Sequence, residues 1–276
     1  MVDLRVGSVT TVLGWPGFAD VTLAGLIFLC VAAFAAGLVD AVCGGGGLIQ
    51  LPALLLVLPG GDPIYSLAVG KISSGSGTAA ALRTYAGKVD IDWRRTTPMA
   101  VLAFAGSIGG AAVADMLPAD VLKVFVMVAL VGVGIYTWRQ PNLGELEVDK
   151  LTPRRQIAAM CAAGLVIGLY DGALGPGTGS FLVFFFVGVI GYAFLRASAA
   201  TKVINLGTNL GGLLYFAVAG KVLWGLGISM AVCNMAGGMV GSAIAVRYGS
   251  SFVRKVFLVV VGGLIVTLGG RALLGI

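Results

Sequence analysis

Apolar segments recur along the whole chain, and only short polar turns separate them. Hydrophobic residues make up 58% of the chain and charged residues 11%, whereas soluble domains carry about 25% charged residues. The segments lack the alternation that marks a membrane β-barrel, and a helix satisfies its own backbone groups in lipid. The sequence therefore predicts an all-α integral membrane protein that crosses the bilayer several times.

We expect about eight to ten transmembrane or re-entrant helical segments, because a crossing helix needs about 20 apolar residues. The apolar segments lie at residues 23–42, 46–58, 66–86, 98–114, 120–138, 157–174, 178–191, 198–219, 223–245 and 253–274. Segments 46–58 and 178–191 are short, which favours re-entrant or broken helices. The sequence leaves open whether these two segments span the membrane or re-enter it.

The two halves of the chain match each other at an offset of 131 positions, the difference between Asp171 and Asp40. The same offset relates Gly168 to Gly37, Gly175 to Gly44, Gly177 to Gly46, Lys202 to Lys71, Gly237 to Gly106 and Gly241 to Gly110. Matching glycines alone would mean little, but the aspartate and lysine matches make the internal repeat specific. We therefore divide the chain into an N-terminal extension (1–22), repeat 1 (23–138), a linker (139–156) and repeat 2 (157–276).

The charges of the loops predict how the repeats are oriented. Loops 87–95 and 247–255 and the linker contain clusters of Lys and Arg, whereas the turn at 114–120 is acidic. Basic loops face the cytoplasm in most membrane proteins, which makes the linker cytoplasmic and gives the two repeats opposite orientations. Inverted-topology repeats are typical of secondary transporters, whose substrate site lies between the repeats. An even number of crossings in each half would instead make the repeats parallel.

Each repeat contains an aspartate followed by a cluster of glycines. Asp40 precedes Gly44, Gly45 and Gly46, and Asp171 precedes Gly175, Pro176 and Gly177. Glycine and proline at this density break a helix, and the positive end of the next half-helix attracts an anion. Glycines also allow close packing of helices, which is the interpretation that we favour for Gly106/Gly110 and Gly237/Gly241.

Each repeat also contains a helix with one polar face. Its residues follow i, i+3, i+7 spacing, which places them on one side of a helix: Lys71, Ser74 and Thr78 in repeat 1, and Lys202, Asn205 and Asn209 in repeat 2. Together with the glycine breaks they form a candidate anion site without a metal. Alternatively, the lysines snorkel to the membrane interface. The acids Asp40 and Asp171 either neutralise these lysines or carry a coupling proton.

Other kinds of site find little support. The chain has no histidine and four scattered cysteines, which points to neither a metal centre nor a disulfide framework. A lysine in "VGKISS" lacks the spacing of a phosphate-binding loop. We therefore predict no enzyme activity, no cofactor and no metal, and we attribute the net charge of +6 to the cytoplasmic loops rather than to nucleic-acid binding. Gln50 and Asn234 are further polar residues inside or near the spans.

The paired motifs "GLVDAVCGGGGLIQLPALL" with "AVGKISSGSGTAAALRTYAGKVDIDW", and "GLYDGALGPGTGSFL" with "RASAATKVINLGTNLGGLLYFAVAGKV", resemble the TauE/SafE family of sulfite and organosulfonate exporters. The resemblance implies an inner-membrane permease that exports sulfite, sulfoacetate or related anions. The residues themselves predict a small anion, alternating access by rocking of one repeat against the other, and an ion gradient or the substrate gradient as the driving force. An anion channel, an importer of another small anion and a homodimer are left open.

Overall fold

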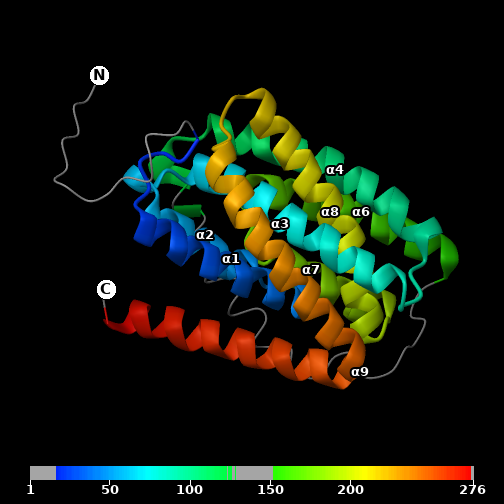
Figure 1. Cartoon of the computed structure of the whole chain (residues 1–276). Helices are drawn as coiled ribbons and strands as arrows, with labels where there is room; N and C mark the ends of the chain where they lie inside the picture. The colour runs from blue at the N-terminus through cyan, green and yellow to red at the C-terminus, as the bar shows by residue number, and fades with distance from the viewer. Residues whose placement is uncertain (1–16, 123, 126–127, 129–151, 275–276) are drawn as a thin grey trace.

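The structure is a computed structural model that describes residues 17–122, 124–125, 128 and 152–274. These residues form helices and connecting turns without a β-strand, which confirms the predicted all-α fold (Figure 1). The first half contains α1 (Leu23–Cys43), α2 (Gly47–Val57), the short 3-10 helix η1 (Pro59–Gly61), α3 (Pro63–Ala86) and α4 (Trp93–Met116). The second half contains α6 (Pro153–Ala173), α7 (Thr178–Phe185), the π-helical turn η2 (Phe186–Ile190), α8 (Phe194–Val218) and α9 (Trp224–Leu274).

The helices of the two halves follow one another in the same order, and several of them begin at the same offset of 131 positions. Helix α3 begins at Pro63 and α8 at Phe194, and α4 begins at Trp93 and α9 at Trp224. Helix α9 is interrupted at Gly249, where φ is 72°, and its last part, drawn in red in Figure 1, runs back at an angle to the first part. Most of the predicted segment 120–138 and of the linker lies outside the described residues.

Within the part of the chain that the structure describes, four helices are long and apolar enough to cross a membrane: Leu23–Cys43, Trp93–Met116, Arg154–Ala173 and Trp224–Ser250. Helices α3 and α8, of 24 and 25 residues, are about 36 Å long at 1.5 Å per residue, but they carry the polar faces and much of their surface is buried. Helix α2 has 11 residues and covers only about half of a 30 Å hydrocarbon core. The chain is therefore a multi-pass membrane protein with short helices in its interior.

Contacts between helices show the direction in which each one runs. Helix α1 runs parallel to the first part of α9, since Phe34 meets Gly237 and Leu38 meets Gly241. Helix α3 also runs parallel to α9, because Gly227 lies against Ile72 and Gly238 against Gly77. Since α1 and α3 then run the same way, the chain between them, which contains α2, returns toward the level at which α1 begins.

Helices α3 and α8, which occupy equivalent positions in the two halves, run in opposite directions. Gly75 of α3 lies against Asn209 of α8, whereas Lys71 lies against Gly212. Residue numbers that increase along α3 therefore meet residue numbers that decrease along α8. An antiparallel relation between equivalent helices supports inverted repeats. The orientation of either repeat in a bilayer stays a prediction.

Two helix pairs are packed backbone against backbone through glycine. A Cβ atom on Gly110 of α4 would lie 2.0 Å from the carbonyl oxygen of Leu169 in α6, and one on Gly237 of α9 would lie 2.0 Å from that of Phe34 in α1. Gly106 and Gly241 are similarly confined. The packing interpretation of these GxxxG glycines is therefore confirmed.

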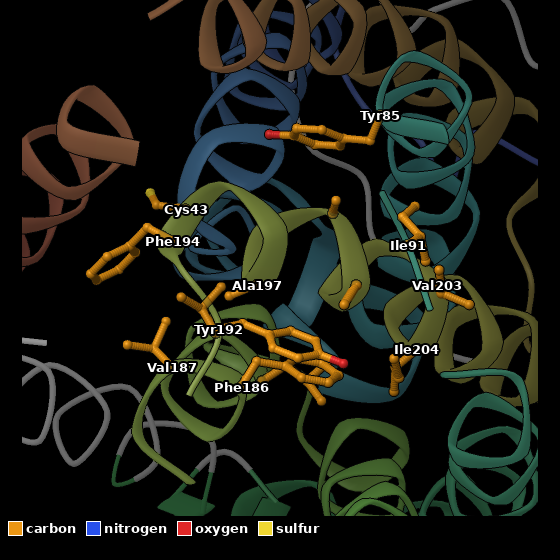
Figure 2. Packing of buried hydrophobic residues seen from close by; sticks show 14 of the residues in the cluster. Cys43, Tyr85, Ile91, Phe186, Val187, Tyr192, Phe194, Ala197, Val203 and Ile204 are labelled. Atoms are coloured by element: carbon orange, nitrogen blue, oxygen red, sulfur yellow. The ribbon is translucent and has the colours of Figure 1, made fainter. Parts of the chain in front are cut away.

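A large hydrophobic cluster joins the ends of α1 and α3 to α7, η2 and the start of α8. Tyr85 is fully buried there and its hydroxyl donates to the carbonyl oxygen of Ala41 over 2.7 Å. Figure 2 shows the ring of Tyr192 lying against that of Phe186, with centroids 5.6 Å apart and an interplanar angle of 6°. This cluster fixes the position of the broken segment of repeat 2 relative to repeat 1.

The glycine contacts predict a sharp difference between two neighbouring positions of α4. Gly110→Ala places a methyl group on the backbone of α6, and we expect it to cost about 1–3 kcal/mol, as overpacking usually does. The control is Gly109→Ala, because a Cβ there meets nothing within 4 Å and alanine favours the helix. Thermal unfolding in detergent measures both variants, and equal melting temperatures would contradict the described α4–α6 contact.

Candidate functional site

Two buried ion pairs connect the repeats, and each joins a lysine of one repeat to the aspartate of the other. The Nζ of Lys71 in α3 lies 2.6 Å from Oδ2 of Asp171 in α6 and also donates to the Asp171 carbonyl oxygen. The Nζ of Lys202 in α8 lies 2.7 Å from Oδ2 of Asp40 in α1 and also donates to the Asp40 carbonyl oxygen. The two pairs are therefore related by the internal repeat.

All four charged side chains are removed from the surface. Lys71 is 4% exposed, Lys202 is 0% exposed, and the carboxylate side chains of Asp171 and Asp40 are 5% and 13% exposed. Neither lysine snorkels, since both ammonium groups are bound inside the helix bundle. The aspartates neutralise the lysines, and a coupling role for the acids stays a prediction.

The glycine-broken segments of the two repeats meet in the interior. Gly44 ends α1 with φ 79°, and its counterpart Gly175 follows α6 with φ 84°, a left-handed conformation that glycine adopts at little cost. A Cβ on Gly44 would lie 2.3 Å from the backbone of Gly179, and one on Gly179 would lie 2.4 Å from the Gly44 oxygen. No side chain fits between these segments, so the two backbones are in direct contact.

A cavity of about 50 Å³ lies where these segments and the polar helix faces converge. By the same kind of measure one water needs about 10–15 Å³, so the cavity accommodates a few waters or a small solute. Its wall includes Gly47 and Gln50 of α2, and Thr178 and Gly179 of α7. The amino ends of both short helices therefore border the cavity.

Most of the predicted site residues line this cavity, and four do not. The lining includes Asp40, Gly44, Lys71, Ser74, Asp171, Gly175, Gly177, Asn205 and Asn209. Lys202 and Thr78 lie behind the wall at Asp40, with the Thr78 hydroxyl 3.5 Å from the Asp40 carboxylate. Gly46 packs on α1, because a Cβ there would lie 2.5 Å from the Ala36 oxygen, and Gly45 is absent from the lining.

The amide groups on α8 are partly used by their own helix. The Nδ2 of Asn209 donates to the carbonyl oxygen of Asn205 over 2.7 Å, and the hydroxyl of Thr208 donates to the same oxygen over 3.0 Å. Asn205 and Asn209 are 5% and 4% exposed. The bond to the backbone carbonyl holds the Asn209 amide in place, and the Oδ1 of the Asn205 amide accepts from the Thr208 hydroxyl over 3.3 Å.

Gln50 lines the cavity but was recognised from the sequence only as a polar residue in a span. Its Oε1 accepts hydrogen bonds from Asn234 Nδ2 at 2.9 Å and from the Ser73 hydroxyl at 3.2 Å. The available signal was a lone amide three residues after the glycine run. Among the described residues, no group of three or more His, Cys, Asp or Glu side chains could hold a metal ion.

The fold and the cavity together define a class of protein. Helices of two equivalent repeats surround a small chamber, and two ion pairs that cross the repeats lie in its wall or directly behind it. Discontinuous helices that meet at such a chamber are characteristic of membrane transporters.

Comparison with known proteins identifies the family. Residues 29–268 match the family described as "Sulfite exporter TauE/SafE", and the chain belongs to this family. It is 36% identical over 236 residues to "Probable membrane transporter protein ORF9" of Sinorhizobium sp, covering 85% of this chain and 88% of the relative. It is 32% identical over 238 residues to "Probable membrane transporter protein YfcA" of Escherichia coli (strain K12), covering 86% of each.

A third relative, "Probable membrane transporter protein" of Haemophilus influenzae, is 29% identical over 237 residues, covering 84% of this chain and 89% of the relative. No solved structure matches the chain. The family and the names of the relatives indicate a membrane transporter, which is not generally an enzyme.

The crossed pairs predict which residues are energetically coupled. Lys71→Met leaves the buried Asp171 carboxylate unpaired, and we expect a loss of about 3–5 kcal/mol. Adding Asp171→Leu removes the unpaired charge, so the double variant should be more stable than the sum of the two single changes. Thermal unfolding of the two single variants and the double variant measures this coupling.

The matched control combines Lys71→Met with Asp40→Leu, the aspartate of the same repeat. Lys71 makes no ion pair with Asp40, so the coupling energy in this cycle should be smaller than the coupling between Lys71 and Asp171. Equal coupling in both cycles would show that the pairing is not crossed between the repeats.

Proposed function

We propose that the protein is a secondary transporter that exports small sulfur-containing anions, either sulfite or organosulfonates such as sulfoacetate, across the cell (inner) membrane. The observation that carries the proposal is the polar cavity between the two glycine-broken segments. Alternating access would open this cavity to one side of the membrane at a time. The family description, "Sulfite exporter TauE/SafE", suggests the substrate class.

The charge balance of the site determines how an anion would be attracted. Lys71 and Lys202 are each matched by one aspartate, so the paired side chains contribute no net charge. The amino ends of α2 and α7 both border the cavity, and each helix end carries the equivalent of about half a positive charge. Backbone and side-chain donors, rather than free ammonium groups, would then bind the anion.

The size of the cavity favours a small substrate. A volume of about 50 Å³ is a few times the ~10–15 Å³ that one water requires, which suits a head group of sulfite size. A longer organosulfonate would need the cavity to open on one side, as it does in an alternating-access cycle.

Two alternatives use the same groups differently. An anion channel would show ohmic unitary currents, whereas a carrier shows saturable flux and exchange of labelled for unlabelled substrate. An importer would differ from an exporter only in the coupling of flux to its driving gradient. Coupling to an ion gradient, and assembly as a homodimer, are further parts of the proposal.

Counterflow in proteoliposomes tests the site with two matched serines. Ser74 lines the cavity, whereas the Ser76 hydroxyl, two positions further along α3, donates to the carbonyl oxygen of Ile72. We expect labelled sulfite to exchange in the wild type, Ser74→Ala to reduce the exchange several-fold by removing a polar group from the cavity wall, and Ser76→Ala to leave it unchanged. Exchange that is equal in all three proteins would contradict the assigned site, and no exchange of any anion would contradict a carrier.

An imposed proton gradient tests the coupling role of the buried acids. We expect a gradient to drive net sulfite flux in the wild type. In Asp171→Asn protein that is shown to be folded despite the loss of the ion pair with Lys71, exchange should persist without this drive, because asparagine accepts a hydrogen bond but does not bind and release a proton. Asp115→Asn is the control, since Asp115 pairs with Lys221 away from the cavity. A gradient response that persists in Asp171→Asn would leave Asp171 with a structural role alone.

A further inference from the structure

The side chain of Gln50 is buried with only half of its amide satisfied. The residue is 1% exposed, and its Oε1 accepts from Asn234 Nδ2 at 2.9 Å, from Ser73 at 3.2 Å and from Ser74 at 3.5 Å. Its Nε2, by contrast, is buried without a hydrogen-bond partner among the described residues. Buried polar groups are nearly always paired, so an unpaired donor at a cavity calls for a ligand or another function.

The neighbours of Gln50 decide which end of the amide is free. The oxygen faces the amino group of Asn234 and two hydroxyls. With the Asn234 amide oriented as in the structure, a flipped Gln50 amide would oppose its own NH₂ group to that of Asn234, and two donors cannot bond to each other. In this arrangement the acceptor oxygen of Gln50 is occupied and its NH₂ group is the end without a partner among the described residues.

The position of the free NH₂ group places it beside the cavity wall. Gln50 itself lines the cavity, and its Nε2 would lie 3.9 Å from a Cβ on Gly70, another residue of the wall. Because Gly70 has no side chain, nothing from this position of α3 covers the donor. The amide lies in the first turn of α2, where the helix end also favours negative charge.

This donor set occurs in only one of the two repeats. At the offset of 131 positions, Gln50 corresponds to Phe181 and Ser73 to Ile204, and Asn234 corresponds to Ala103. The glycine motifs, lysines and aspartates are shared by both repeats, whereas this donor cluster is not. A substrate bound between the repeats would therefore meet a hydrogen-bonding wall on the α2 side and no equivalent at position 181.

We propose that Gln50 is the specificity-determining donor of the site and that its NH₂ group binds an oxygen of a trigonal oxyanion head group, –SO₃ in sulfite or a sulfonate. The assignment rests on the proposed transport function and names the residue that would distinguish one substrate from another. Asn234 is a positioning residue, because it holds the Gln50 oxygen and does not line the cavity. A donor fixed in this way selects ligands that present an acceptor oxygen and disfavours groups that present a hydroxyl or ammonium at that point.

Glutamine-selective ¹⁵N labelling tests this in the unmodified protein. The chain has three glutamines, Gln50, Gln140 and Gln156, so the side-chain NH₂ signals are few, and Gln140→Glu and Gln156→Glu assign the remaining one. Sodium sulfite is added under anaerobic conditions, and binding is measured in parallel by calorimetry. We expect the Gln50 signal to shift with the same midpoint as the calorimetric binding curve and the Gln156 signal to stay in place. Binding of sulfite with an unmoved Gln50 signal would overturn this inference and leave the proposed function intact.

Two substitutions provide the quantitative test. Gln50→Met keeps the length of the side chain and removes its donors, and we expect the sulfite Kd to rise at least tenfold. Gln50→Glu adds a negative charge and should raise the Kd further, whereas the control Ser76→Ala should bind like the wild type. Unchanged affinity in a folded Gln50→Met protein would overturn the inference. Wild-type protein that binds neither sulfite, sulfoacetate, taurine, sulfate nor thiosulfate would remove the proposed function and this inference together.

Discussion

The crossed pairing of Lys71 with Asp171 and of Lys202 with Asp40 is the interaction on which the centre of the protein depends. An isolated charge in the interior of a membrane is costly, and a charge that loses its partner destabilises the fold strongly. Each repeat contributes one lysine and one aspartate, yet neither pairs its own. The interior can be highly polar because it is electrically balanced, and it is balanced only when both repeats are in place.

The apolar segments predicted the helices well, and the differences arise at their polar ends. The segment predicted at 98–114 forms a helix that begins at Trp93, five residues earlier. Its first turn contains arginine and threonine, which no apolar pattern includes, but the Asp92 side chain caps the Arg95 N–H. Likewise α3 begins at Pro63, where Asp62 caps the helix, rather than at residue 66. Helix caps and a proline in the first turn carry this information.

The sequence was less informative about which residues meet in the site. The internal repeat singled out both lysines and both aspartates, which form two ion pairs in the structure. Distance along the chain, however, would pair Lys71 with Asp40 rather than with Asp171, which is 100 positions away. Gln50 was not placed in the site, because the comparison of the repeats singles out residues that both halves share. The position equivalent to Gln50 in the second half is Phe181. The role of Gly46 depends on the approach of α1, which a sequence does not record.

The parallel glycine contacts of α1 and α3 with α9, and of α6 and α8 with α4, have a mechanical consequence. Each of these two groups takes helices from both halves of the chain, so the groups of tightly packed helices do not coincide with the two sequence repeats. The boundary between these two groups of helices runs between α3 and α8. A displacement of one group relative to the other would move Lys71 away from Asp171 and Lys202 away from Asp40, because the members of each pair belong to different groups. Both ion pairs would therefore have to lengthen together.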